Sequence, residues 1–489
     1  MIARKSPPGV QAALVLAAAL ILAAPQLSAQ KLERDKAPKA GKAPSLKVPA
    51  WTKAKLANGA ELIVVEKRDL PLVALNIDFI GGASNYEPAD KLGVAALAAQ
   101  MLSEGTKART ADQLSDAQQL LGTSISASVA GESGTIRFTS LKDKFEPAMA
   151  LLADMLLNPT FPDTAFERNR ARTLVALTQA KDQPNTIAAN MFSKVVFGDE
   201  HPYGRVVSEK TVRAVTRGDV MAFAAAYFRP GRAVITVAGD IDAKTARGVV
   251  EKALAAWPAG GERPAFAYGP VPAPKARMIY LVDKPKAAQS EFALGGPGPP
   301  RRTPDYYALQ VMNRLLGGIF QSRLNHDIRE VKGYSYGVNS GFAFGRGPGA
   351  FRAGGGIVSA KSDSALIAFM THFKGVQGEL PFTDDELTVG KVSLIQSLPG
   401  RFATVNEIAA AISSLYTEEL PETYFNDYTA KIEAVTREDL VRVAKKHIDM
   451  DHMSLVIVGD RAAIEGPLKA TGIAPIQVLD VEGRPVPVP

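Results

Sequence analysis

Two stretches of this chain repeat one pattern at a distance of 220 residues. Residues 216–240 read TRGDVMAFAAAYFRPGRAVITVAGD, and residues 436–460 read TREDLVRVAKKHIDMDHMSLVIVGD. Each stretch begins with Thr-Arg-x-Asp, continues through a helical segment and an apolar strand, and ends with Gly-Asp. A constant offset with the same order of elements favours a duplicated domain over chance similarity. The chain is therefore expected to form two similar units.

The region between the two copies predicts where they are joined. Residues 258–275 (PAGGERPAFAYGPVPAPK) are rich in proline and glycine, have no hydrophobic period and lie near the middle of the chain, as an interdomain linker would. The full length of 489 residues is sufficient for more than one hydrophobic core. We expect an N-terminal domain over residues 50–257 and a C-terminal domain over residues 276–489.

Both halves mix strand-like and helix-like periods. Apolar strands are predicted at 62–65, 73–77 and 278–282, with a hairpin formed by 124–131 and 134–141. Amphipathic helices are predicted at 90–104, 111–121, 143–157, 163–181 and 211–227. These patterns predict an α+β fold of two homologous domains, each of them a mainly antiparallel sheet covered by helices.

The first 29 residues have the composition of a secretory signal. Arg4 and Lys5 precede an apolar run over residues 10–24, and small residues around Ser28 and Ala29 follow it. The run is shorter than the ~20 residues of a membrane-spanning helix, although an uncleaved N-terminal anchor is the alternative. We expect an exported protein, with the periplasm as its compartment and without an integral membrane segment in the mature chain.

The charge and cysteine content exclude several classes of function. The formal charge is +7, but much of it lies in residues 30–49, a tail rich in alanine, proline and lysine that is expected to be a disordered spacer. The remainder has no basic stripe of the kind that binds nucleic acid. Cysteine is absent, which excludes disulfides, a thiolate nucleophile and cysteine-bound zinc.

The stretch Gly333-Tyr334-Ser335-Tyr336-Gly337 fits the G-x-S-x-G pattern of a serine nucleophile elbow. Such an elbow needs a strand before the serine and a helix after it. Here residues 320–331 have a helical period and residues 334–344 alternate like a strand, so the order is reversed. A serine hydrolase acting through Ser335 is therefore the least favoured reading.

Arg329 and Tyr336 lie on either side of the same helix-to-strand junction. An arginine near a helix end offers forked donors to a peptide carbonyl or carboxylate, and a tyrosine hydroxyl on the next strand can reach the same oxygen. Without other context, an ion pair of Arg329 with Asp327 or Glu330 and a core position for Tyr336 explain the residues more simply.

Residues 317–338 (GGIFQSRLNHDIREVKGYSYGV) resemble the C-terminal signature of the pitrilysin, insulinase and mitochondrial-processing-peptidase family of inverted-motif zinc peptidases. Residues 56–88 and 93–106, HPYG at 201–204 and both Gly-Asp strand ends resemble this family in order and spacing. The resemblance covers nearly all of residues 50–485.

The resemblance implies a zinc site whose ligands this chain lacks. Active members are expected to carry His-x-x-Glu-His in the helix corresponding to residues 93–106, where this chain has Ala96, Ala99 and Gln100. A third ligand, a glutamate, would fall near Val175-Ala176, where no carboxylate stands. Alanine has no donor atom and glutamine is a poor zinc ligand, so we expect no metal and no catalytic residues in this chain alone.

A zinc site at a different place in this chain is also not expected. His326 and Glu330 are spaced four residues apart on a predicted helix, but two ligands without a third do not make a site, and a solvated helix face is the simpler reading.

The resemblance also implies a role for Arg329 and Tyr336. In family members built from half-length chains, a non-catalytic subunit brings such a pair to the zinc site of its partner, where the pair holds substrate or stabilises the oxyanion. The chain is expected to be that substrate-binding subunit, without a cofactor of its own, paired with a homologous zinc-carrying chain and acting on peptides or unfolded polypeptides. The alternative is a degenerate member that serves only as a scaffold, as the resemblance to respiratory-complex core subunits permits.

Overall fold

The computed structural model describes residues 46–262, 265–266, 268–272 and 274–486. The predicted signal segment and most of the basic tail lie outside the described residues. Within the described part of the chain, no helix is both long and apolar enough to cross a membrane.

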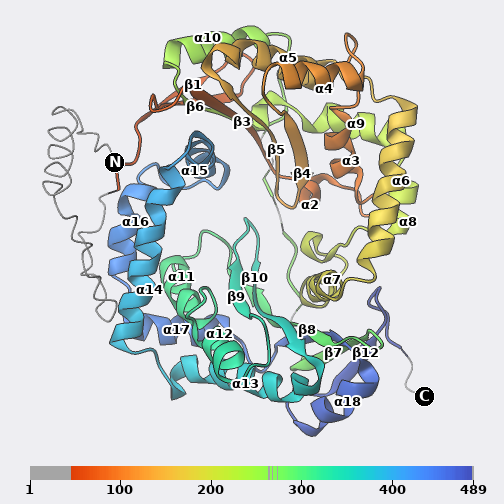
Figure 1. The fold of residues 1–489 in the computed structure, drawn as a ribbon, viewed down its shortest axis with the longest axis vertical. Helices are drawn as coiled ribbons and strands as arrows, with labels where there is room; N and C mark the ends of the chain where they lie inside the picture. Colours follow the sequence, from red (N-terminus) through yellow and green to blue (C-terminus); the bar gives the residue numbers. More distant parts are fainter. Residues whose placement is uncertain (1–45, 263–264, 267, 273, 487–489) are drawn as a thin grey trace, which may run out of the picture. The chain divides into compact units, whose positions relative to one another are not determined.

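The first half forms a sheet of six strands (Figure 1). Its strand order is β1 (Trp51–Lys55), β2 (Glu61–Glu66), β6 (Ala233–Gly239), β3 (Leu72–Ile80), β5 (Ser133–Leu141) and β4 (Ser126–Ala130). Only β2 and β6 are parallel to each other, and the other neighbours are antiparallel. Both faces of the central strand β6 are covered, and all seven of its residues are buried.

The second half repeats this arrangement. Its strand order is β12 (Ile476–Leu479), β7 (Met278–Asp283), β11 (Ser454–Gly459), β8 (Gln289–Gly298), β10 (Gly349–Val358) and β9 (Asn339–Ala343). The series β7-β11-β8-β10-β9 has the order and directions of β2-β6-β3-β5-β4, including the parallel central pair. Only the outermost strands differ, because β1 pairs antiparallel and β12 pairs parallel. The predicted α+β fold of two homologous, mainly antiparallel units is confirmed.

The repeated sequence pattern corresponds to a repeated local structure. Helices α9 (Arg217–Tyr227) and α17 (Arg437–His447) both begin at a threonine whose hydroxyl accepts the N–H of the aspartate three residues later, and whose own N–H bonds back to that carboxylate. These capping boxes satisfy N–H groups that a helix start otherwise leaves unpaired. Each helix then leads into the central buried strand of its sheet.

Helices surround both sheets. In the first half they are α2 (Ala83–Tyr86), α3 (Val94–Met101), α4 (Ala111–Leu120), α5 (Phe145–Leu157), α6 (Asp163–Ala180), α7 (Pro184–Phe197), α8 (Glu209–Ala214), α9 and α10 (Ala243–Ala253). In the second half they are α11 (Tyr306–Leu316), α12 (Arg323–Asn325), α13 (Ser362–Lys374), α14 (Asp384–Ser397), α15 (Val405–Thr417), α16 (Tyr424–Glu433), α17 and α18 (Arg461–Ala470). The single helix predicted over 211–227 is wrong, because the chain is extended at Val215 and Thr216 and restarts as a newly capped helix.

Two helices lie over the sheet of the opposite half (Figure 1). Helix α15 packs on β3 and β6 of the first sheet, where Ile408 and Ile412 share a core with Ala74 and Ala238. Helix α7 packs on β8 and β11 of the second sheet in the same way. We call the faces covered by α15 and α7 the inner faces of the two sheets. Each half therefore completes the hydrophobic burial of the other.

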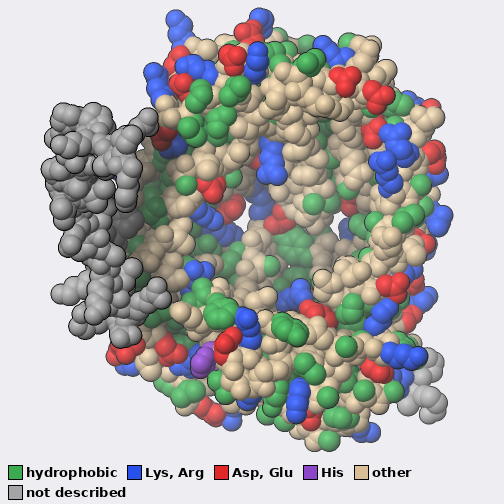
Figure 2. All heavy atoms as spheres, in the orientation of Figure 1, with side chains coloured by type: hydrophobic (Ala, Val, Ile, Leu, Met, Phe, Trp, Pro, Cys, Tyr) green, Lys and Arg blue, Asp and Glu red, His purple; other side chains and the backbone are tan. Residues whose placement is uncertain are grey.

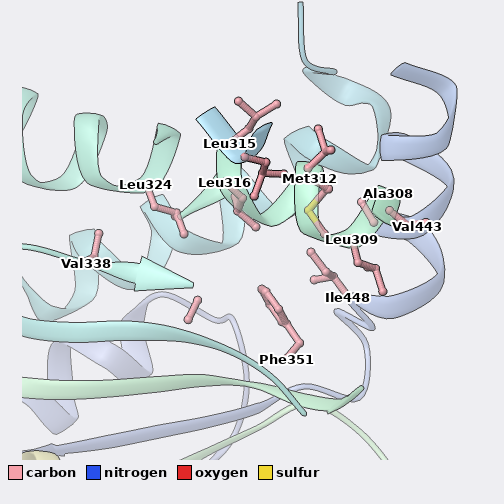
Figure 3. Close-up of a cluster of buried hydrophobic side chains, with 14 of the residues drawn as sticks. Ala308, Leu309, Met312, Leu315, Leu316, Leu324, Val338, Phe351, Val443 and Ile448 are labelled. Atoms are coloured by element: carbon pink, nitrogen blue, oxygen red, sulfur yellow. The ribbon is translucent and has the colours of Figure 1, made fainter. Parts of the chain in front are cut away.

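The outer face of the second sheet has a conventional core. Phe351 of β10 points from the sheet toward Leu309 and Met312 of α11, with Ile448 beside them (Figure 3). All four side chains are nearly inaccessible to solvent. Packing of this kind leaves the inner face as the place where the second sheet can meet a ligand.

Candidate functional site

Helix α3 carries the three positions of the expected zinc motif. Its N-terminus is capped by Glu87, whose carboxylate accepts the N–H groups of Gly93 at 2.9 Å and Ala95 at 2.8 Å. Burial raises the pKa of Glu87, although these two hydrogen bonds act against the increase. Ala96 and Gln100 are exposed on this helix, while Ala99 is buried.

A cavity of about 550 Å³ opens beside this helix. Ala99 and Gln100 line it on one side, and Ala176 of α6 lines it on the other. The structure therefore brings the motif helix and the neighbourhood of the expected third ligand together, although Val175 itself is 56% exposed and is absent from the lining.

The chemistry of this cavity does not suit zinc. The one carboxylate in the lining, Glu104, forms an ion pair with Arg168 and accepts a hydrogen bond from Asn169 at 2.9 Å. Gln100, Ala99 and Ala176 supply no anionic or imidazole donor, and zinc sites in proteins use such donors. Among the residues that the structure describes, no group of three or more His, Asp or Glu side chains could hold a metal ion.

The cavity adjoins the edge of the first sheet. Ser126 and Ala127 of β4 are part of its lining, and β4 is the last strand in the sheet order. Within the described part of the chain, β4 pairs only with β5, so its other side is an open strand edge. An open edge can accept an extended peptide as an additional strand.

Arg329 lies in a π-helical turn, His326–Val331, that directly follows α12. Its guanidinium lies over the ring of Phe320 at 4.5 Å from the centroid, and its Nε lies 3.3 Å from a carboxylate oxygen of Glu330. The simpler reading of an ion pair with Glu330 is thus observed. Even so, 36% of the side chain stays exposed.

Tyr336 is 87% exposed, so the alternative of a core aromatic is wrong. The strand predicted over 334–344 begins only at Asn339. The cause is Ser335, whose hydroxyl donates to Gly356 O at 2.7 Å and accepts the N–H of Gly337 at 2.9 Å. Such local side-chain bonds compete with a strand ladder, and they leave Tyr336 on an exposed bend.

The same bonds disfavour a serine nucleophile. Ser335 is only 8% exposed, and no histidine ring bonds to its hydroxyl within the described residues. The turn that holds His326 and Glu330 is π-helical, so residues four apart do not stack as they would on an α-helix.

The structure contains a polar junction that sequence reasoning missed. Glu132, in the turn between β4 and β5, accepts the hydroxyls of Tyr203 and Tyr268 and the backbone N–H of Arg346 at 2.8 Å. Burial, followed by the hydrogen bond to Glu132, raises the pKa of Tyr268 to about 12. The junction joins the β4–β5 hairpin to the β9–β10 hairpin. In the sequence, HPYG at 201–204 only resembles a family motif, and no local pattern predicts that Tyr203 bonds to Glu132.

Comparison with family models gives two adjacent matches. Residues 64–206 match the model described as insulinase (peptidase family M16), and residues 214–394 match the one described as peptidase M16 inactive domain. The chain belongs to the M16 peptidase family. The family resemblance seen in the sequence is thus confirmed, and the second model covers much of the second half.

Curated relatives of this chain are named as zinc proteases. The chain is 26% identical over 285 residues to the uncharacterized zinc protease YmxG of Bacillus subtilis, covering 58% of this chain and 68% of that one. It is 27% identical over 318 residues to the uncharacterized zinc protease ML0855 of Mycobacterium leprae, covering 65% and 71%.

Solved structures share the fold of this chain. A peptidase M16 inactive domain from Pseudomonas fluorescens superposes with a TM-score of 0.77 at 28% identity, covering 85% of this chain and 99% of that one. The periplasmic protease PqqL of Escherichia coli superposes with a TM-score of 0.70 at 16% identity, covering 86% of this chain and 50% of that one. At that identity the second likeness concerns the fold alone.

Proposed function

We propose that this chain is the non-catalytic, substrate-binding subunit of a heterodimeric M16 zinc peptidase, exported to the periplasm. The observation that carries the proposal is a contrast between two places. The motif helix α3 has no side chain suited to bind zinc, whereas Tyr336 is exposed and Arg329 is partly exposed, so that a second chain can reach both.

The lack of donors on α3 supports a non-catalytic role. Peptide hydrolysis at a zinc site needs metal ligands and a general base, and Ala96, Ala99 and Gln100 supply neither. The zinc is expected in a homologous partner, where it would activate water and polarise the scissile carbonyl. This chain retains the cavity and the open β4 edge, which can hold a peptide or an unfolded polypeptide without cutting it.

The surroundings of Arg329 support a contact in trans. Phe320, whose ring lies under the Arg329 guanidinium, is 59% exposed, so an apolar side chain accompanies Arg329 at this surface. Exposed aromatic residues and arginine are enriched where protein interfaces form. In the proposed complex, Arg329 donates forked hydrogen bonds to the substrate backbone, and Tyr336 donates its hydroxyl to the carbonyl oxygen that becomes negative.

The test is peptide cleavage by this chain alone, by a co-expressed chain that carries His-x-x-Glu-His, and by the mixture. Only the mixture should cut, and Arg329→Ala or Tyr336→Phe should each lower kcat/KM about tenfold or more, equivalent to ~1.4 kcal/mol of transition-state stabilisation. Arg213→Ala, at an exposed arginine in the first half, is the matched control and should leave cleavage unchanged.

Two outcomes would contradict this proposal. Cleavage by this chain alone would mean that the argument from missing ligands is wrong. Equal cleavage by the partner with and without this chain would instead favour the scaffold function.

A further inference from the structure

Arg352 is a half-buried cation that forms no hydrogen bond or ion pair with the residues that the structure describes. It lies on β10, opposite Gly295 of β8 and Gly341 of β9. Its guanidinium approaches the ring of Phe192 on α7 at 6.0 Å from the centroid. Among the described residues it makes no hydrogen bond, and no carboxylate lies within the 4.0 Å of an ion pair. Since burying an unpaired charge is costly, such a position calls for an anionic partner.

Arg352 lines a cavity of about 710 Å³ on the inner face of the second sheet. The floor is formed by small residues that leave room beside the guanidinium, including Gly341, Ala343 and Ala350. The walls are aromatic, with Phe192 and Phe197 from α7. In the space-filling view, a hollow opens between the two sheets, with charged side chains along its rim (Figure 2). A hollow of this size that combines apolar walls with a few placed polar and charged groups is typical of ligand pockets.

Two carboxylates, Glu132 and Glu291, are the nearest candidates for an ion pair with Arg352 among the described residues, and neither forms one. Glu132 also lines the cavity, but its oxygens accept the tyrosine hydroxyls and the Arg346 N–H described above. Glu291 is on the same face of the sheet, four residues from Gly295, and forms no ion pair with Arg352. Burial lowers the pKa of Arg352, and the Glu291 carboxylate offsets that effect only in part.

We propose that this cavity binds a carboxylate of the peptide held by the subunit, with Arg352 as its ionic partner and the aromatic walls packing on the neighbouring residues. The guanidinium matches the geometry of a carboxylate, and the pairing is strong where water is excluded. The inference rests on the proposed function, because the ligand is the peptide substrate. It assigns the class of that substrate: peptides with an acidic side chain or a free C-terminal carboxylate near the segment in the cavity.

The experiment measures binding to this chain alone, so it does not depend on a catalytic partner. Fluorescence anisotropy is recorded with short labelled peptides of valine, threonine and alanine that carry one central Glu and an amidated C-terminus. Matched peptides replace Glu with Gln, or combine Gln with a free C-terminus. The wild-type chain should bind one or both carboxylate peptides about tenfold more tightly than the neutral peptide, and the two carboxylate peptides distinguish a side chain from a chain end.

Three variants make the test specific. Arg352→Gln should abolish the preference without weakening the neutral peptide, and Arg352→Lys should restore part of it. Arg137→Gln changes an exposed arginine on β5, the equivalent strand of the first sheet, and should preserve the preference. Circular dichroism and urea unfolding check that each variant folds.

Equal binding of all the peptides by the wild-type chain would overturn the inference, as would a preference that survives Arg352→Gln in a folded variant. If Arg137→Gln removes the preference for carboxylate peptides and Arg352→Gln does not, the peptide carboxylate binds outside the Arg352 cavity. If the mixture with a zinc-carrying chain fails to cut but the carboxylate preference holds, the catalytic proposal fails and the binding site stands.

Discussion

The two sheets have the same topology, but equivalent points on their inner faces differ in chemistry. In the first sheet, Val234 of the central strand β6 lies beside Asp78, which in turn pairs with Thr135. The carboxylate of Asp78 accepts the hydroxyl of Ser413 on α15 at 2.5 Å. The covering helix is thus tied to the sheet by a polar contact.

In the second sheet, the corresponding series is Ser454 of β11, Gly295 of β8 and Arg352 of β10. Gly295 has no side chain to offer to α7, and the Arg352 guanidinium has no hydrogen-bonded partner among the described residues. A duplicated backbone therefore reproduces positions, while the side chains decide whether a position is closed by internal contacts or left open to a ligand.

The largest expected effect on stability comes from equivalent substitutions in the hydrophobic cores of the two sheets. Ile235 of β6 and Leu455 of β11 are equivalent residues, and both are fully buried. Ile235→Ala and Leu455→Ala should each lower the free energy of unfolding by about 2–5 kcal/mol, because each leaves a cavity in a packed core. Since α7 and α15 each pack on the opposite half, either substitution should destabilise the whole unit in one transition.

Urea unfolding followed by two signals checks this expectation. Trp257 is buried in the core of the first half, and Trp51 of β1 donates its indole N–H to Tyr416 of α15 at 2.7 Å, so tryptophan fluorescence reports the first half together with its contact to α15, while circular dichroism reports all helices. If fluorescence and circular dichroism give the same transition in each variant, the two halves unfold together, as expected when each half completes the core of the other. If Leu455→Ala shifts the circular dichroism but leaves the fluorescence transition in place, the halves unfold independently.

A second prediction compares the Asp78–Ser413 contact on the first sheet with Arg352 on the second. Burial raises the pKa of Asp78, and hydrogen bonds, first that from Ser413, act against the increase. Ser413→Ala should cost about 1–3 kcal/mol of unfolding free energy, because a buried acceptor loses its donor. Arg352→Gln should cost no more than about 0.5 kcal/mol, because no hydrogen bond or ion pair with the described residues is lost and a half-buried charge is removed. A cost for Arg352→Gln as large as that for Ser413→Ala would reveal a structural role for Arg352.

Local patterns predicted much of this fold. The capping boxes at Thr216 and Thr436 follow from their Thr-x-x-Asp sequences, and the predicted hairpin over 124–141 corresponds to β4 and β5. The family spacing places a third zinc ligand near Val175 and Ala176. In the structure, Ala176 lines the same cavity as Gln100. These features depend on residues close in sequence or on a known family spacing.

Features that depend on distant residues could not be predicted in this way. The amphipathic pattern of α7 predicts a helix with a buried side, but it does not specify which sheet receives that side. The bend at Tyr336 arises because Ser335 bonds to Gly356, which a strand-like alternation does not reveal. In the sequence Arg352 looks like an ordinary polar residue of a strand, and only its surroundings on β8, β9 and α7 show that it forms no ion pair within the described part of the chain.

The smallest predicted effect compares two equivalent aspartates. Asp219 receives hydrogen bonds from Lys91 at 2.6 Å and from Thr216, and these lower its pKa to about 2. For Asp439, burial alone would raise the pKa, but bonds from Arg442 and Thr436 outweigh it and lower the pKa. A carboxyl whose pKa is lower in the folded state adds stability above its ordinary pKa near 4, and this stability is lost as the pH falls through the folded value.

Asp219→Asn tests this linkage, because asparagine also caps helices well and the substitution removes mainly the charge. At neutral pH the variant should be less stable than the wild type by about 1 kcal/mol or less, since the pair is partly exposed. Between about pH 4 and pH 2 the wild type should lose that advantage, so the two curves of urea midpoint against pH converge. Asp439→Asn should show a smaller convergence, because burial is the largest influence on the Asp439 pKa and opposes its lowering. Parallel curves for Asp219→Asn and the wild type would show that the Lys91 contact does not form in solution, and would leave the two capping boxes energetically alike.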